Sequence, residues 1–160
     1  MSFSLIRIDD RIIHGQTMTS WTQERKVDGI IVVSDDAATN QLRQRVLKAA
    51  AGNIKLGIYS TEQAVVKIPM ALESSKHFFL ISDSPIVFSN LLNMGVNFGS
   101  ELNVGPMNTK TNTKAIAKTV SISKDDYDAF ENIQNHGIEI QFQLLPYDTI
   151  KTWDELKKKF

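Results

Sequence analysis

One short segment near the N-terminus combines side chains that suit phosphoryl-transfer chemistry. Residues 9–15 read DDRIIHG, with one histidine at His14. Imidazole is a competent nucleophile near neutral pH, because its unperturbed pKa is about 6.5. Arg11 can make paired hydrogen bonds to a phosphate, and Gly15 lets the backbone approach a ligand closely. His14 is therefore either an ordinary polar loop residue or a nucleophile.

The two acids before Arg11 also have two readings. In one, Asp9 and Asp10 end the strand and cap the turn. In the other, one of these carboxylates accepts the N–H of His14. That contact would fix the tautomer of His14 and aim its other ring nitrogen at an incoming group. The same carboxylate would hold Arg11 in place.

A second polar loop follows an apolar segment at residues 29–34. Its sequence SDDAATNQLR predicts that Asp36 or Thr39 caps a helix, with Arg43 one turn into that helix. Arg43 is either a solvated surface charge or, if the two loops adjoin, a second phosphate ligand. Residues 103–112, NVGPMNTKTN, form another candidate loop. Lys110 in this loop and Lys114 just after it are either ordinary surface charges or residues that guide an anionic partner.

Two rival functions use the same loops. Asp9, Asp10, Asp35 and Asp36 could form a carboxylate cluster for Mg²⁺, as in an aspartyl-phosphate protein or a phosphatase. That reading leaves His14 without a role and places the positive Arg11 where it would repel the metal. The other rival is a non-catalytic module that binds an anion with the first loop.

The segments around these loops alternate between apolar strands and helices. The expected strands are residues 3–9, 29–34, 54–60, 77–82, 100–105, 118–123 and 138–145. The expected helices are residues 15–26, 39–52, 61–68, 84–95, 123–137 and 149–160. This alternation predicts a single α/β domain over residues 1–160, with an open, mostly parallel twisted sheet and helices on both faces. Ligands bind at the carboxyl ends of such strands, so the candidate loops should share one edge.

Local patterns add detail to four of the helices. Leu42, Val46, Leu47 and Ala50 are expected on one buried face of the second helix. Pro69 is expected to end the third helix. Ser84 with Pro85, and Ser123 with Asp126, are typical of helix starts.

Composition excludes several classes of protein. Lys plus Arg equals Asp plus Glu, so no global charge favours nucleic acid or an anionic membrane. The absence of cysteine excludes disulfides and zinc-thiolate sites. No apolar run approaches the roughly 20 residues of a membrane span, and the N-terminus lacks a signal-peptide pattern. We expect a cytoplasmic protein that needs no metal or cofactor and does not insert into the membrane.

The segment RIDDRIIHGQTMTSW resembles the signature of the mannose/fructose/sorbose-type IIB components of the bacterial sugar phosphotransferase system. That signature is roughly R-x-D-x-R-L-[IV]-H-G-Q-V followed by a tryptophan. IIVVSDD, NVGPM and DAFENIQNHGIEIQFQ match further family segments, so the resemblance covers nearly the whole chain. Departures from the family pattern occur at Ile12, Thr17, Pro106 and Asn112.

The resemblance implies a phosphocarrier, a protein-Nπ-phosphohistidine–sugar phosphotransferase. Such proteins take a phosphoryl group from a phosphohistidine of a IIA partner. They pass it to a hexose or amino sugar during uptake through membrane IIC and IID components, with which they associate peripherally. His14 matches the phosphorylated histidine of the family, and Asp9 matches the aspartate of the motif. Arg11 and Arg43 match arginines near the phosphoryl group, while Gly15, Ser34 and Asp35 lie in the matching loops.

Overall fold

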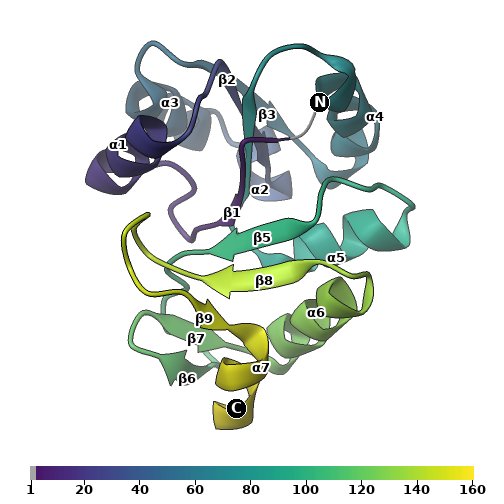
Figure 1. Cartoon of the computed structure of the whole chain (residues 1–160). Coiled ribbons are helices and arrows are strands. Elements are labelled where there is room, and N and C mark those ends of the chain that lie inside the picture. The colour runs from purple at the N-terminus through teal and green to yellow at the C-terminus, as the bar shows by residue number, and fades with distance from the viewer. Residues whose placement is uncertain (1–2) are drawn as a thin grey trace.

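The computed structural model of the chain describes residues 3–160, and its centre is a seven-stranded sheet (Figure 1). All neighbouring strands pair in parallel except the last two, which are antiparallel. The strands lie in the order β3 (Lys55–Tyr59), β2 (Gly29–Val33), β4 (Phe78–Ser82), β1 (Leu5–Ile8), β5 (Glu101–Val104), β8 (Glu139–Phe142) and β9 (Lys151–Thr152). The expected open, mostly parallel α/β sheet is confirmed.

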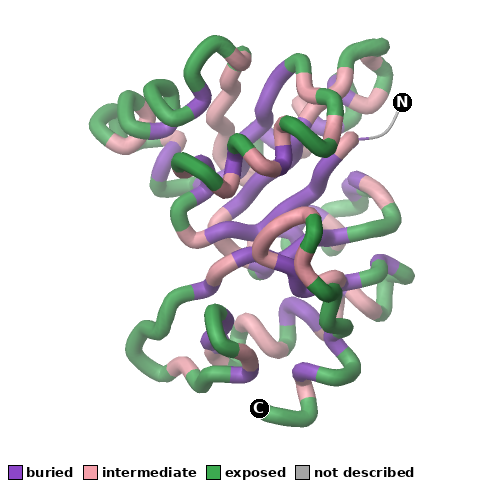
Figure 2. The backbone as a smooth tube through the Cα atoms, turned by 60° about the vertical axis from the view of Figure 1, so that its left-hand side comes forward, coloured by how far each residue is buried: buried purple, intermediate pink, exposed green. Residues whose placement is uncertain are grey.

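Helices cover both faces of this sheet, each over its own hydrophobic core. One face carries α1 (Gly15–Glu24), α2 (Asp35–Thr39) and α3 (Gln41–Ala51). The other carries α4 (Thr61–Glu73), α5 (Pro85–Asn93), α6 (Lys124–Asn135) and α7 (Trp153–Leu156), the last of which continues into a 3₁₀ turn at Lys157–Lys159. Figure 2 shows the buried strands between more exposed helices. Strands β1 and β2 are buried along their whole length, which explains why they are apolar except for Arg7 in β1.

Two of the expected helix starts are confirmed. Ser84 accepts a hydrogen bond from the N–H of Ile86, with Pro85 as the first residue of α5. At the start of α6, Ser123 and Asp126 form a capping box. These side chains satisfy N–H groups that have no partner within the helix.

The expected buried face of α3 is confirmed for Leu47 and wrong for Leu42, Val46 and Ala50. Leu42 and Val46 are 71% and 60% exposed, and Ala50 is exposed as well, whereas Leu47 and Ala51 face the core. In the first turn of α3, the side chains of Arg43 and Gln44 turn toward α2 instead. Arg43 pairs with Asp36 and Asp83, and the Gln44 amide donates to carbonyls of α2. The helical period was identified correctly, but the buried stripe is rotated.

Three expected boundaries also differ. Pro69 does not end α4, which runs on to Glu73, because the proline lies at an exposed position where one missing backbone bond is tolerated. Residues 118–123 contribute only β7 (Val120–Ile122), which pairs with β6 (Lys114–Ala117) in a separate hairpin outside the main sheet. The C-terminal segment forms β9, α7 and a 3₁₀ turn rather than one helix.

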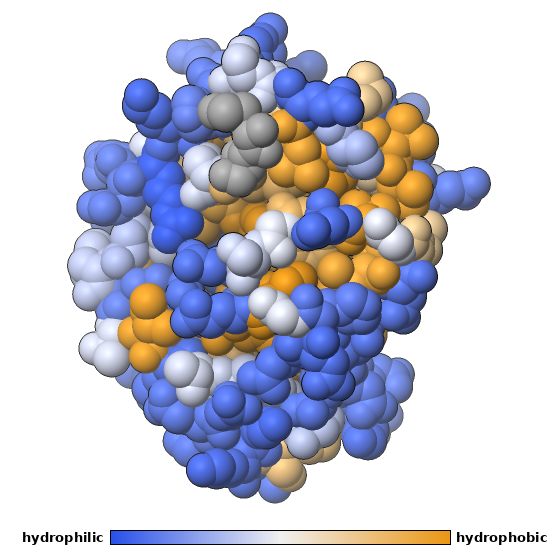
Figure 3. Space-filling model, turned by 45° about the vertical axis from the view of Figure 1, so that its right-hand side comes forward, coloured by the Kyte–Doolittle hydropathy of each residue, from blue (hydrophilic) through white to orange (hydrophobic). Residues whose placement is uncertain are grey.

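No helix among residues 3–160 is long and apolar enough to cross a bilayer. Figure 3 shows apolar side chains gathered in the upper part of one face, on the side where α4 lies. There Val66 and Met70 are more than half exposed, and a hollow of about 380 Å³ lies between β3 and α4. None of the candidate residues lines this hollow, so the chemistry must be sought elsewhere.

Candidate functional site

The candidate loops lie side by side at the carboxyl edge of the sheet. In the strand register, Ile8 pairs with Ser82 on one side and with Val104 on the other. Val33 also pairs with Ser82, and Val104 pairs with Phe142. The loops that follow β2, β4, β1, β5 and β8 therefore emerge in one row, as the topology predicted.

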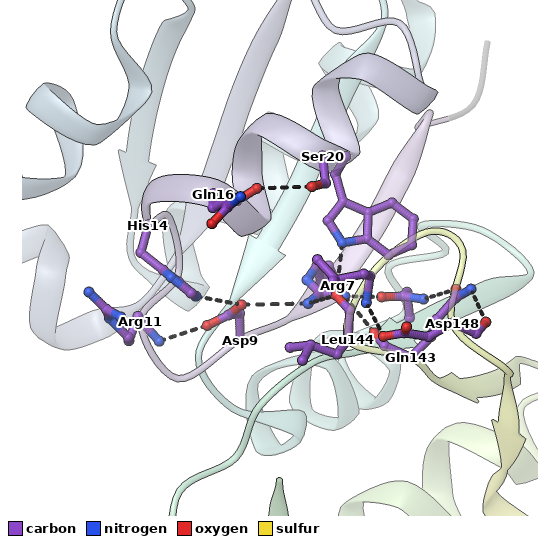
Figure 4. A network of polar contacts seen from close by, with 12 residues as sticks. Arg7, Asp9, Arg11, His14, Gln16, Ser20, Gln143, Leu144 and Asp148 are labelled. Atoms are coloured by element: carbon purple, nitrogen blue, oxygen red, sulfur yellow. Dashed lines mark hydrogen bonds and ion pairs between the residues drawn. The ribbon is translucent and has the colours of Figure 1, made fainter.

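His14 and Asp9 form a close pair in this row. The Nε2 atom of His14 lies 3.3 Å from Oδ2 of Asp9, and the Asp9 side chain is only 2% exposed (Figure 4). The other carboxylate oxygen, Oδ1, accepts the backbone N–H of Arg11 at 2.9 Å. Nδ1 of His14 has no hydrogen-bond partner among the described residues. Asp9 thus holds both the imidazole and the backbone of the loop.

His14 is also the residue that precedes the first turn of α1. Its backbone is extended, and no side chain of residues 3–160 caps this helix. The other six α-helices are capped by Ser34, Asn40, Ser60, Ser84, Ser123 and Thr152. The free N–H groups and positive dipole end of α1 are therefore available to an anion beside the imidazole.

The loop backbone adopts an unusual conformation between Asp9 and His14. Ile12 has a φ of 61°, which is rare for a β-branched residue, and its N–H donates to the Asp9 carbonyl at 2.9 Å. Such a conformation costs about 1–3 kcal/mol. Because the Ile12 side chain is 1% exposed, its burial holds the strained turn in place. This buried anchor fixes the path of the chain from the strand to His14.

Arg11 and Arg43 differ in their surroundings. Arg11 is exposed, and its guanidinium makes no ion pair with any described residue. Arg43 is held by two carboxylates, Asp36 at 2.8 Å and Asp83 at 2.9 Å. Partial burial acts to lower the pKa of Arg43, but these two hydrogen bonds outweigh it, and the pKa is raised. Of these two arginines, an anion at this edge would meet one without an ion pair among residues 3–160 and one that two carboxylates already share.

Asp83, in the loop that follows β4, was missed by the sequence reasoning. It directly follows Ser82, whose strand neighbour Ile8 precedes Asp9. The Ser34 hydroxyl lies 3.5 Å from an Asp83 oxygen and also accepts the N–H of Ala37. Ser34 therefore caps α2, and Asn40 caps α3. The expectation that Asp36 or Thr39 would be a cap is wrong, because the chain forms a short extra helix that contains both.

The four acids of the proposed magnesium cluster have separate partners. Asp35 accepts hydrogen bonds from the N–H and hydroxyl of Thr61, and Asp36 pairs with Arg43. Asp10 accepts the N–H of Asn108 and lies 3.7 Å from Lys110. Within residues 3–160, no group of three or more histidine, aspartate or glutamate side chains is placed to hold a metal ion. The geometry does not assemble the magnesium site.

Asp10 joins the first loop to the loop after β5. Burial raises its pKa above the ordinary value of 3.8, and the contacts with Asn108 and Lys110 only partly oppose this effect. The 103–112 loop therefore lies against the first loop, and it brings Lys110 to the edge. Lys114 is directed away, because its ammonium group donates to the Phe160 carbonyl.

Arg7 is a second residue that sequence reasoning did not assign. Its guanidinium lies 3.6 Å from Asp9 and donates to Asn103 and to the carbonyls of Gln143 and Leu144 (Figure 4). Burial lowers the pKa of Arg7 from its ordinary value to about 10, against the opposing effect of Asp9, so the group stays charged at neutral pH. The signal was an arginine within the fully buried strand LIRI, which requires a buried counter-charge.

Gly105 provides the space for this arginine. A Cβ atom at position 105 would overlap the guanidinium, lying 2.7 Å from Cζ of Arg7. The glycine of the NVG segment is therefore required by the packing of Arg7.

Comparison with known proteins identifies clear relatives. The family model for the sorbose subfamily IIB component of the PTS system matches residues 3–160. The fructose-specific EIIB component of the PTS system of Bacillus subtilis is 35% identical over 153 residues, covering 92% of this chain and 91% of that protein. The mannose-specific EIIAB component of Escherichia coli is 32% identical over 163 aligned positions, 99% of this chain but 49% of that protein. The crystal structure of the IIBSor domain of the sorbose permease from Klebsiella pneumoniae superposes with a TM-score of 0.91 and 27% identity, covering 100% and 99% of the two chains.

Proposed function

Because the chain belongs to the sorbose subfamily of the IIB components of the sugar phosphotransferase system, we propose that it carries a phosphoryl group on His14. In this proposal the donor is the phosphohistidine of a IIA component, and the acceptor is a sugar in the membrane IIC and IID components. One observation carries the proposal. The buried Asp9 carboxylate holds Nε2 of the single histidine that stands at an uncapped helix N-terminus.

The proposed transfer needs little covalent chemistry from the protein. The lone pair of Nδ1 on His14 forms a bond to phosphorus while the N–P bond of the donor histidine breaks. The Nε2 proton stays on the ring, and the positive charge that develops there is balanced by Asp9. The electron pair of the broken bond returns to the donor imidazole. In the second transfer a sugar hydroxyl forms a bond to phosphorus while the N–P bond of His14 breaks, the electron pair returns to Nδ1, and the hydroxyl proton is released to solvent.

The charge of the transferred group is balanced by parts of the same edge. The free N–H groups at Gly15 and the next two residues of α1 are placed for its equatorial oxygens, and Arg11 supplies an unpaired guanidinium. Arg43 joins them by sharing its guanidinium with Asp36 and Asp83. Ser34 and Asp35 act indirectly, because they hold the second loop and the start of α4 in place.

The names of the relatives support the partners of this proposal. The name of the Escherichia coli relative, an EIIAB component, joins A and B in one protein, of which this chain covers 49%. We infer that the covered part is the B part, because the family model that matches this chain is that of a IIB component. The fructose, sorbose, mannose and N-acetylgalactosamine named in the relatives suggest a hexose or an amino sugar as the acceptor. We place the protein in the cytoplasm, where it would dock on the membrane components from outside the bilayer.

Intact-mass analysis tests the proposal. The protein is incubated with phosphoenolpyruvate, the general phosphotransferase proteins and a IIA component. We expect the protein to gain the mass of one phosphoryl group and to lose it in acid. His14→Ala should show no gain, whereas His136→Ala should gain the same mass as wild type. His136 is a suitable control because its ring only contacts the Asn132 carbonyl of its own helix. Label that persists in His14→Ala would contradict the proposal.

The same experiment separates the two rival functions. An aspartyl-phosphate protein would give acid-stable label that hydroxylamine removes and EDTA prevents. A simple anion-binding module would show no covalent gain of mass.

A further inference from the structure

Arg7 and His14 contact the same oxygen of Asp9. Nη2 of Arg7 lies 3.6 Å from Oδ2, and Nε2 of His14 lies 3.3 Å from it. Because both atoms contact this oxygen, Nη2 of Arg7 and Nε2 of His14 lie within about 7 Å of each other. Because Arg7 and His14 share this carboxylate oxygen, a change in one of them alters the interaction of Asp9 with the other.

We propose that Arg7 is a positioning residue for phosphoryl transfer, which fixes Asp9 and opposes protonation of His14. Its positive charge weakens the attraction of Asp9 for a second proton on the imidazole. The lone pair of Nδ1 then stays free for attack at neutral pH. This inference rests on the proposed function of His14, and it adds a residue outside the loop that carries the histidine.

Three elements, β5, the segment after β8 and α1, hold the guanidinium in one orientation. Asn103 on β5 accepts one of its N–H groups, and the carbonyls of Gln143 and Leu144 after β8 accept others at 3.0 Å. The Trp21 ring of α1 lies 5.1 Å from its Cζ atom, and the Trp21 indole N–H donates to the same Leu144 carbonyl. A planar guanidinium satisfies this arrangement, whereas an ammonium group would not.

Stability alone is a poor reason for this buried charge. Arg7 is 1% exposed, and removing a guanidinium from water costs several kcal/mol before its partners repay it. Buried ion pairs are often no more stable than apolar side chains of similar size. The charge is therefore better explained by its effect on the Asp9–His14 pair.

Few other charges face the imidazole. On its own loop these are Asp9, Arg11 and the positive end of α1. No further charged side chain of residues 3–160 makes an ion pair with His14. Removal of Arg7 should therefore shift the titration of His14 in one direction, toward stronger proton binding.

The test compares Arg7→Met with Arg25→Met. Arg25 is a matched control, because its guanidinium also stacks on Trp21, at 5.3 Å, but it donates to the Ser4 carbonyl and does not contact Asp9. In Arg7→Met we expect the NMR titration midpoint of His14 to rise by about one pH unit. Phosphorylation by the IIA donor at pH 7 should fall severalfold, by at most the tenfold that a shift of one pH unit allows, and recover largely at pH 8.5. Arg25→Met should leave both measurements unchanged.

A folded Arg7→Met with an unmoved His14 midpoint and an unchanged rate profile would overturn the proposal. A loss of rate that higher pH does not restore would reduce Arg7 to a purely structural role and would overturn it as well. If Arg7→Met does not fold, the wild-type protein gives the answer. Its Arg7 guanidinium NMR signals should follow the titration of His14, and those of Arg25 should not. Signals of Arg7 that ignore this titration would refute the idea.

These measurements separate the two proposals. The titration of His14 requires no donor, so it reports on Arg7 even if no phosphoryl transfer occurs. Absence of label in the wild-type protein, together with the expected shift of the midpoint, would refute the proposed function alone.

Discussion

The Nε2 atom of His14 lies 3.3 Å from Oδ2 of Asp9, and this contact leaves Nδ1 as the ring nitrogen without a partner among the described residues. A carboxylate on one side of an imidazole fixes the tautomer and orients the other nitrogen. Because Asp9 is itself held by Arg7 and by the Arg11 N–H, the orientation of the histidine depends on several contacts.

Asp9→Asn should slow phosphoryl transfer while preserving the shape of the site. An asparagine can keep the bond to the Arg11 N–H, but it cannot balance the charge that develops on the imidazole. We expect the rate of labelling by a IIA donor to fall by roughly a hundredfold or more, with the far-UV circular dichroism unchanged. A rate within twofold of wild type would show that the carboxylate charge has no part in the transfer.

Arg11→Lys should lose more activity than a substitution at an unrelated exposed arginine. Lysine keeps the positive charge but not the paired donor geometry that suits a phosphoryl group, so we expect a loss of roughly tenfold. The control is Arg45→Lys on the exposed side of α3. Steady-state rates at saturating donor make the comparison, and equal rates for both variants would remove the phosphate-binding role of Arg11.

The contribution of Asp10 to the free energy of unfolding depends on pH. Its pKa is raised in the folded protein by burial, so folding favours the protonated form. The stabilisation from this group is complete below the unfolded value of 3.8 and is lost as the pH rises through the folded value. Asp10→Asn, which keeps an acceptor for the Asn108 N–H, should therefore be at least as stable as wild type at pH 7.

Urea unfolding of Asp10→Asn and wild type at pH 7 and pH 4 checks this sign. The advantage of the variant in free energy of unfolding should shrink at the lower pH. A variant that is clearly less stable at pH 7, but not at pH 4, would mean that the ionised carboxylate stabilises the fold.

The exposed and buried leucines of α3 provide a test of packing. Leu47→Ala should lower the free energy of unfolding by about 2–5 kcal/mol, because it leaves a cavity over the sheet. Leu42→Ala should change it by no more than about 0.5 kcal/mol, since Leu42 is 71% exposed. Similar losses in the two variants would contradict the observed orientation of the helix.

The architecture could be predicted from the sequence because most strands and helices have local sequence patterns that identify them. Runs such as GIIVV carry no polar residue, and Ser84–Pro85 marks a helix start wherever it lies. The rotation of α3 was not predictable in the same way. It depends on Arg43, whose partner Asp83 is forty residues away in the sequence. The local spacing of apolar residues contains no information about such a distant contact.

The candidate site could also be predicted only in its local part. Asp9, Arg11 and His14 lie in one loop, so a single turn brings them together. The role of Arg7 was hidden, because its partners Asn103, Gln143 and Leu144 come from two other strand ends. Only the fold brings these segments to the same point.

The most direct test of the account is the position of the phosphoryl group on the imidazole ring. The protein is labelled with ¹⁵N-histidine, phosphorylated through the donor chain, and analysed by ¹⁵N and ³¹P NMR at alkaline pH, where phosphohistidine persists. We predict phosphorylation of His14 at Nδ1, with Nε2 still carrying its proton toward Asp9. A phosphoryl group on Nε2 of His14, or on another residue, would contradict the central claim.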